Sequence, residues 1–138
     1  MTFLLDTNVV SELRKTRPHG AVLAWYESHP PTAYGLPALA LYEVQAGAEV
    51  TRRQNPAKAQ EIEAWADALT ETAVVIPLDA ACAREAAKMM ARKSKLLIED
   101  AMIAAIAKVN GLTVATRNTR DFEHFAVPVV NPFLFPKN

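Results

Sequence analysis

Two acidic residues follow apolar segments that have the character of buried strands. Asp6 comes directly after the apolar run 3–5, and Asp121 follows the apolar run 112–115 after a short polar segment that contains Asn118. Short apolar runs of this kind are typical of strands in a parallel sheet, whose ligands bind outside the carboxyl ends of the strands. We therefore expect these polar residues at one edge of a sheet.

Two further acidic residues fall in predicted helices that begin near this edge. Asp100 lies in the first turn of a helix expected over 98–109, which leads back into a strand and so starts at the carboxyl side of the sheet. Glu43 lies in the second turn of a helix expected over 37–50, and its flanking residues are apolar. The sequence therefore predicts that four carboxylates converge, which are those of Asp6, Glu43, Asp100 and Asp121.

Several carboxylates at one edge of a sheet repel one another unless protons or cations intervene. The sequence has one cysteine, Cys82, and three scattered histidines, which excludes a cysteine-based zinc or iron–sulfur site. Oxygen ligands favour hard cations, so we expect Mg²⁺ or Mn²⁺ as the cofactor. Such an ion engages a substrate phosphate, polarises a phosphorus–oxygen bond and supplies a nucleophilic water.

Other kinds of catalytic site have less support. The four glycines are isolated, so there is no glycine-rich phosphate loop, and no serine stands in a G-x-S-x-G motif. The histidines are expected to be structural or surface residues, and they are His19, His29 and His124. Each acid alone has a structural explanation, because Asp6 and Asp121 could cap helices, and Asp100 and its neighbour Glu99 could favour the positive end of a helix dipole. Their convergence at one edge is what favours a functional site.

The elements that must position these acids alternate along the chain as short apolar strands and amphipathic helices. Strands are expected at 3–5, 33–36, 74–76, 112–115 and 127–130. Helices are expected after Asn8 and over 21–28, 37–50, 57–69, 80–93 and 98–109, with a loop and a short helix over 116–122. This alternation predicts an α/β fold, namely a three-layer α/β/α sandwich with a mostly parallel central sheet, formed by a single domain over 1–138.

The composition narrows the class of protein further. The chain has 138 residues, of which 51% are hydrophobic and 22% are charged, and its 15 basic residues balance its 15 acidic ones. The apolar content excludes general disorder, and the zero net charge means that any contact with nucleic acid must be local. The beginning of the sequence lacks a basic segment and reaches Asp6 after three apolar residues, unlike a signal peptide or a membrane anchor. We expect a cytoplasmic protein.

Two sets of basic residues could guide a polyanion to the acidic site. One set recurs at helical spacing and consists of Arg84, Lys88, Arg92 and Lys95. We interpret it as a solvated helix face or, alternatively, as a rim that guides phosphates. Arg117 and Arg120 flank the expected acidic site, so they are better candidates for direct contact with phosphate.

Four segments of the chain, in this order and spacing, resemble the PIN-domain family. They are residues 3–8 (FLLDTN), the helical Glu43, residues 98–100 (IED) and residues 116–122 (TRNTRDF). More closely, the chain is similar over essentially its whole length to the VapC- and FitB-type toxins of bacterial type II toxin–antitoxin operons. The resemblance implies an α/β/α fold and a Mg²⁺-dependent ribonuclease that forms a homodimer. It also implies a small antitoxin partner that binds operator DNA and fills the acidic pocket with its tail.

By position, Asp6, Glu43 and Asp100 match the three core acids of the family. Many members have an aspartate where this chain has Asn118, which makes Asp121 the nearest candidate for a fourth acid and leaves open whether a second metal binds. The resemblance implies that Asp6 and Asp100 hold Mg²⁺ and that Glu43 holds or deprotonates a metal-bound water. Asp121 and Asn118 would complete the shell. Residues that orient the carboxylates would be Thr7, Asn8 and Thr116.

Two other functions remain open from the sequence. One is a Mg²⁺-dependent phosphatase with Asp6 as its nucleophile, although such enzymes usually have a second aspartate two residues later, where this chain has Asn8. The other is a non-catalytic module whose acidic pocket captures a basic peptide tail. A covalent aspartyl-phosphate would identify the first, and metal binding without hydrolysis would favour the second.

Overall fold

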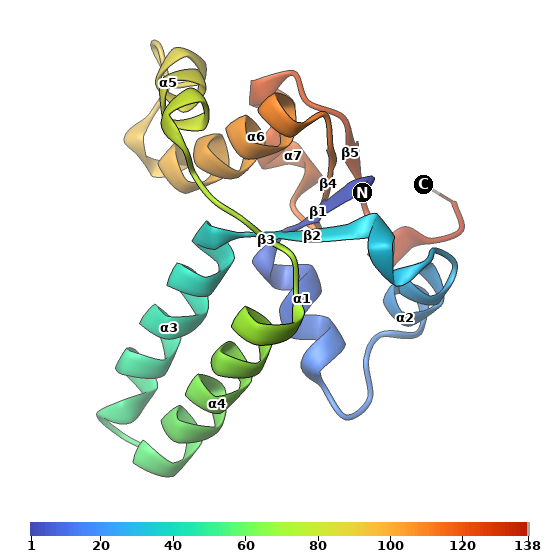
Figure 1. Cartoon of the computed structure of the whole chain (residues 1–138), viewed down its shortest axis with the longest axis vertical. Coiled ribbons are helices and arrows are strands. Elements are labelled where there is room, and N and C mark those ends of the chain that lie inside the picture. The colour runs from blue at the N-terminus through green and yellow to red at the C-terminus, as the bar shows by residue number, and fades with distance from the viewer. Residues whose placement is uncertain (138) are drawn as a thin grey trace.

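The computed structural model describes residues 1–137 and has a five-stranded parallel sheet at its centre (Figure 1). The strands are β1 (Phe3–Leu5), β2 (Tyr34–Pro37), β3 (Val75–Ile76), β4 (Thr113–Ala115) and β5 (Val129–Val130). They lie in the order β3-β2-β1-β4-β5, and every neighbouring pair runs parallel. The helices are α1 (Thr7–Arg14), α2 (Gly20–Glu27), α3 (Ala38–Arg52), α4 (Pro56–Thr72), α5 (Ala80–Met89), α6 (Ile98–Asn110) and α7 (Thr119–Phe122). Single 3₁₀ turns are η1 (Pro31–Ala33), η2 (Lys95–Leu97), η3 (Glu123–Phe125) and η4 (Pro132–Leu134).

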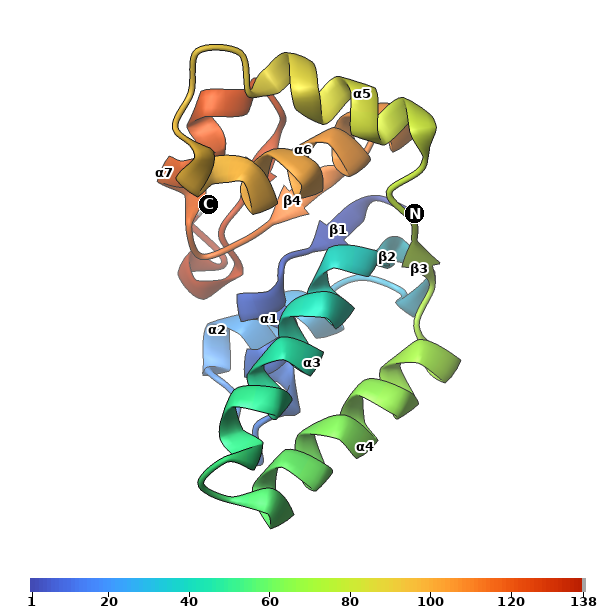
Figure 2. The ribbon, with the colours of Figure 1, turned by 90° about the vertical axis from the view of Figure 1, so that its left-hand side faces the viewer.

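The helices cover both faces of the sheet, which confirms the predicted three-layer α/β/α sandwich (Figures 1 and 2). Consecutive side chains of a strand point to opposite faces. Accordingly, Leu4 of β1 packs with residues of α5, α6 and α7, whereas Leu5 packs with residues of α1 and α2. Within the described part of the chain, no helix is long and apolar enough to cross a membrane.

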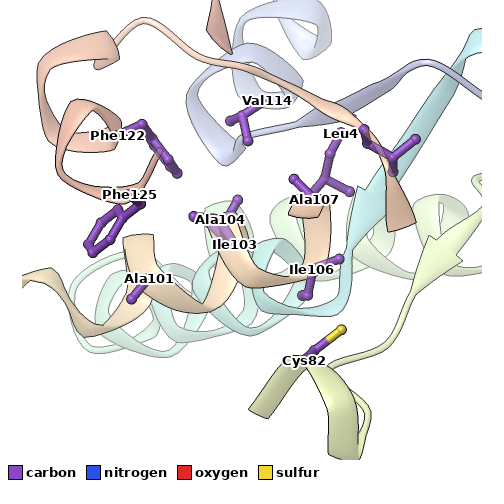
Figure 3. Packing of buried hydrophobic residues seen from close by; sticks show 11 residues of the cluster. Leu4, Cys82, Ala101, Ile103, Ala104, Ile106, Ala107, Val114, Phe122 and Phe125 are labelled. Atoms are coloured by element: carbon purple, nitrogen blue, oxygen red, sulfur yellow. The ribbon is translucent and has the colours of Figure 1, made fainter. Parts of the chain in front are cut away.

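The core on one face fixes the position of α6, the helix that carries Asp100 (Figure 3). Ile103 and Ile106 are fully buried in the same cluster as Leu4 of β1. The helix ends at Gly111, whose φ of 68° is a left-handed conformation that glycine adopts without steric cost. Because α6 then leads directly into β4, its first turn lies near the carboxyl ends of the strands.

On the other face, α3 and α4 form a helical hairpin that extends away from the sheet (Figures 1 and 2). Ala48 of α3 and Ala59 of α4 are fully buried, and such small side chains let two helices approach closely. Glu63 of α4 accepts hydrogen bonds from Gln45 Nε2 at 2.8 Å and from Arg52 at 3.1 Å, both on α3. The hairpin therefore holds α3, and with it Glu43, in a defined place.

The boundaries of α5 differ from the prediction. The helix ends at Met89 rather than near residue 93, because the chain turns there and Arg92 adopts a left-handed conformation with a φ of 65°. Arg84 and Lys88 lie on α5, whereas Arg92 and Lys95 lie beyond its end. The predicted basic stripe is therefore not one continuous helix face.

Pro37 also has a different place from the one predicted. It was expected in the first helical turn, but it is the last residue of β2, where it pairs with Ile76, and it precedes α3 as the N-cap residue. A proline suits this position because its fixed φ is compatible with extended backbone and its missing N–H is not needed there.

Candidate functional site

The carboxyl ends of β1 and β4 lie side by side, and this brings Asp6 and Thr116 together. Leu5 of β1 is paired with Ala115 of β4, and the Asp6 N–H donates to the Ala115 carbonyl at 2.9 Å. Asp6 and Thr116 are the next residues along the two strands, and both are buried. The sheet edge that the sequence predicted therefore has a buried carboxylate at its centre.

The Asp6 carboxylate is held by hydrogen bonds to both of its oxygens. Oδ1 accepts from the backbone N–H of Thr7 at 2.8 Å, so that Asp6 also caps the start of α1. Oδ2 accepts from the Thr116 hydroxyl at 2.8 Å and from Asn8 Nδ2 at 3.2 Å. The helix-capping bond of Asp6 is thus compatible with the role predicted for it, because this bond orients the carboxylate.

The loop after β4 is tied to the same cluster. The backbone N–H of Arg117 donates to Asn8 Oδ1 at 3.1 Å, and that of Asn118 donates to Thr116 Oγ1 at 3.0 Å. Thr116 therefore donates its proton to Asp6 and accepts one from the loop. These bonds join the residues that we expected to orient the carboxylates.

Glu43, on α3, lies close enough to Asp6 for the two charges to interact. Its half-buried position raises the pKa of the Glu43 carboxyl from 4.5 to about 7, chiefly because burial disfavours the charged form. The Thr7 hydroxyl favours the charged form and offsets part of this rise, although the two groups are not in hydrogen-bonding geometry. The negative charges of Asp6, Glu99 and Asp100 raise the pKa further.

Asp100 and Asp121 complete the group of acids from the opposite side of the sheet. Burial, followed by the charges of Asp6, Asp121 and Glu99, raises the pKa of Asp100 from 3.8 to about 6. The pKa of Asp6 is also raised, mainly by burial, with a smaller contribution from Asp121 and with its hydrogen bonds acting in the opposite direction. These effects place the charges of Asp6 and Asp100 near each other, with Glu43 and Asp121 each close to both of them.

No basic side chain in residues 1–137 forms an ion pair with any of these acids. The ion pairs of the described chain involve other carboxylates, which are Glu12, Glu49, Glu61, Glu63 and Glu85. Carboxylates that raise one another's pKa without a cationic partner favour binding of a cation from solution.

The donor set fits a hard divalent cation. In the described residues, no three His, Cys, Asp or Glu side chains are gathered closely enough to hold one ion between them. Mg²⁺, however, is usually bound through one or two carboxylates, with water and substrate phosphate in its other positions. The buried Thr7 Oγ1, which has no hydrogen-bond partner in residues 1–137, is a further oxygen available to a metal-bound water. The site thus suits Mg²⁺ or Mn²⁺ rather than a metal that needs a complete protein cage.

The two arginines predicted to bind phosphate form no ion pair with the acidic residues in the described part of the structure. The Arg117 guanidinium lies over the Phe133 ring, with its Cζ 4.5 Å from the ring centroid, so it is turned toward the C-terminal segment. Arg120 is exposed on α7 and makes no ion pair within the described chain. Asn118 is exposed at the start of α7, where its side chain does not cap the helix.

Glu99 also contributes to the acidic site, although from the sequence we interpreted it only as a residue that favours the positive end of a helix dipole. Its charge raises the pKa of both Glu43 and Asp100, which places it in the field of the acidic site. The sequence feature that could have indicated this role is the pair of adjacent acids, Glu99 and Asp100, in the first turn of α6. Adjacent residues point in different directions on a helix, but electrostatic effects extend over several ångströms and include both.

Comparisons with known proteins identify the family of this chain. The family model of the PIN domain matches residues 3–128. The plasmid stability protein StbB of Pseudomonas syringae pv. tomato is 35% identical over 137 residues, covering 94% of this chain and 97% of StbB. The VapC ribonuclease Y4jK of Sinorhizobium fredii is 34% identical over 141 residues, covering 94% and 96%.

Solved structures give the same result for the fold. The crystal structure of FitAcB from Neisseria gonorrhoeae has a TM-score of 0.78 at 28% identity, covering 97% of this chain and all of the matched chain (100%). A toxin–antitoxin complex from Klebsiella pneumoniae has a TM-score of 0.71 at 28% identity, covering 95% of this chain and 98% of the matched one.

Proposed function

This chain belongs to the PIN-domain family, and we propose that it is a Mg²⁺-dependent ribonuclease that acts as the toxin of a type II toxin–antitoxin system. The observation that carries the proposal is the group of carboxylates at the end of β1 and on α3, α6 and α7, which forms no ion pair with a basic side chain in the described chain. A relative of similar length that is named a VapC ribonuclease supports the choice of RNA as the substrate.

In this mechanism each acidic residue has a separate task. Asp6 and Asp100 would hold Mg²⁺, which when bound polarises a phosphorus–oxygen bond and activates water for hydrolysis. Glu43 accepts a proton from the attacking water, a task that suits a carboxyl whose pKa is raised to about 7. Asp121 on α7 and Asn118, directly before that helix, complete the polar shell.

Thr116, Asn8 and Thr7 keep the Asp6 carboxylate in one orientation through the hydrogen bonds described above. Fixed carboxylates lower the cost of reorganisation when a phosphodiester is bound.

The proposed partners are RNA, a small DNA-binding antitoxin and a second copy of the chain. The similarity to a chain solved in a toxin–antitoxin complex supports the antitoxin, because that match is 28% identical and covers 98% of the solved chain. Co-expression with the product of an adjacent short reading frame, followed by size-exclusion chromatography with light scattering, tests both the antitoxin and the homodimer.

The decisive experiment is cleavage of total RNA by the purified protein with Mg²⁺, with Mn²⁺ and with EDTA. Asp6→Asn should reduce cleavage by orders of magnitude while keeping the fold, because asparagine retains the capping oxygen and the volume of aspartate. Asp67→Asn, on the exposed face of α4, is the matched control and should cleave like the wild-type protein. An active Asp6→Asn protein with a normal circular dichroism spectrum would contradict the proposal, as would a covalent phosphate found on Asp6.

A further inference from the structure

A cavity of about 220 Å³ opens beside the acidic site, between α1, α3 and α4. At one end it is lined by Thr7 and Glu43, and at the other by Arg14 and Trp65. Thr7 and Arg14 are seven residues apart on one face of α1, which corresponds to a length of about 10 Å. We call this cavity the α1–α3 groove. It leads from the proposed catalytic carboxylate to an aromatic residue.

The two ends of the groove differ in chemistry. At the acidic end, Thr7 Oγ1 is buried and has no hydrogen-bond partner in residues 1–137. At the far end, the Arg14 guanidinium carbon lies 5.1 Å from the centroid of the Trp65 ring, and Arg14 takes part in none of the ion pairs of the described chain. The guanidinium lies over the indole ring, and together they form a planar cationic and aromatic surface on which nucleobases stack.

Gly47 forms part of the wall between these two ends. It lies within α3, where glycine is less favourable than alanine for a helix. Neither packing nor backbone conformation requires glycine here, because an added Cβ would meet no atom within 4 Å and the residue has no positive φ. The missing side chain leaves the groove open between Glu43 and Trp65.

We propose that the α1–α3 groove binds the base of an unpaired nucleotide next to the scissile phosphate, an inference that rests on the proposed ribonuclease function. The phosphate would lie at the acidic end, and the base would stack against Arg14 and Trp65. At about 220 Å³ the groove is smaller than the pockets of roughly 300–1,000 Å³ that enclose drug-sized ligands, so its size suits a single base. A base inside a duplex cannot enter it, so the preferred substrate is single-stranded at this position.

Nucleotide binding can be measured without any cleavage. The probes are the four nucleoside 5′-monophosphates, with ribose 5-phosphate as the control that lacks a base, in buffer containing Mg²⁺. The readout is tryptophan fluorescence, which reports on Trp65 because Trp25, at 2% exposure, is in the core. We expect the nucleotides to quench the fluorescence in a saturable way and ribose 5-phosphate to leave it unchanged.

Gly47→Gln is the variant that closes the groove. Glutamine favours a helix more than glycine does and no neighbour opposes its Cβ, so the variant should fold with equal or higher thermal stability. We expect its dissociation constants for the nucleotides to be at least tenfold weaker and its RNA cleavage to fall. Ala46→Gln, on the exposed side of the same helix and outside the groove, is the matched control and should behave like the wild-type protein.

The outcomes separate the groove from the proposed activity. If the wild-type protein cleaves RNA while Gly47→Gln retains normal cleavage and normal nucleotide binding, the groove proposal is wrong and the ribonuclease remains. If the nucleotides quench Trp65 but the protein cleaves no RNA, the nucleotide site is supported and the ribonuclease function fails. Equal quenching by ribose 5-phosphate would also overturn the role of the base.

Discussion

The Thr116 hydroxyl donates a 2.8 Å hydrogen bond to Asp6 Oδ2 across a separation of 110 residues. Thr116 is fully buried, and Asp6 is 6% exposed. This bond connects the end of β1, the central strand of the sheet, with the end of its neighbour β4. The orientation of the main carboxylate therefore depends on strand pairing as well as on its own helix cap.

Replacing Thr116 with valine should reduce stability without changing the shape of the site. Valine keeps the volume of threonine but leaves the buried Asp6 oxygen without its strongest side-chain donor and the Asn118 N–H without its acceptor. We expect a loss of about 1–3 kcal/mol in the free energy of unfolding, measured with urea. Thr113→Val, at the half-exposed start of the same strand, should lose little. Equal stability of the Thr116→Val and wild-type proteins would show that the bond contributes nothing.

The metal-free protein should become less stable as the pH rises toward neutrality. Folding raises the pKa of Glu43 from 4.5 to about 7 and that of Asp100 from 3.8 to about 6. The folded state then binds more protons than the unfolded state between these values, so the unfolding free energy falls with increasing pH. Carboxyls whose pKa is lowered by folding, such as Glu12, act in the opposite direction only at more acidic pH.

Urea unfolding in EDTA at about pH 5 and about pH 7.5 measures this dependence. Glu43→Gln should flatten it, because the variant removes a carboxyl whose pKa is raised to about 7 in the folded protein. Glu27→Gln, exposed on α2, should leave it unchanged. A metal-free protein whose stability increases over this range would contradict the expected repulsion.

Addition of Mg²⁺ should reverse the effect of pH. A cation that binds only the folded protein stabilises it by about 2.7 kcal/mol when its concentration is 100 times the dissociation constant. It should stabilise more above pH 7, where the carboxylates are charged, than at about pH 5. Asp100→Asn should reduce the Mg²⁺-dependent shift in melting temperature, whereas Asp67→Asn should not. If Mg²⁺ raises the melting temperature equally in both variants, Asp100 is not a ligand of the metal.

The places of these acids in the fold were predictable because each lies at or near the end of an element. A strand of three apolar residues followed by Asp6 indicated the sheet edge, and the rule that a crossover helix starts at the carboxyl side placed Asp100 near it. Glu43 was predicted from its position in the second turn of α3. These inferences needed only local patterns and the geometry of parallel sheets.

Other features depend on contacts that local sequence does not encode. Arg117 turns toward Phe133 because η4 folds back beside α2, a long-range arrangement with no signal near Arg117. The end of α5 was placed too late, since no glycine marks the left-handed conformation at Arg92. The α1–α3 groove is formed by side chains of three helices, and Gly47 alone did not indicate it.

Glu99→Gln should change the pH profile of cleavage more than its maximum rate. The charge of Glu99 raises the pKa of both Glu43 and Asp100, so its removal lowers both values. The acid limb of the rate profile should therefore move to lower pH, by less than about one unit, while the rate above pH 7 stays within a few-fold of the wild-type rate. Glu123→Gln, exposed in η3, is the matched control. A large loss of rate at every pH would instead indicate that Glu99 binds the metal or the substrate directly. If the acid limb of the profile does not move, the charge of Glu99 does not affect the pKa values of the site.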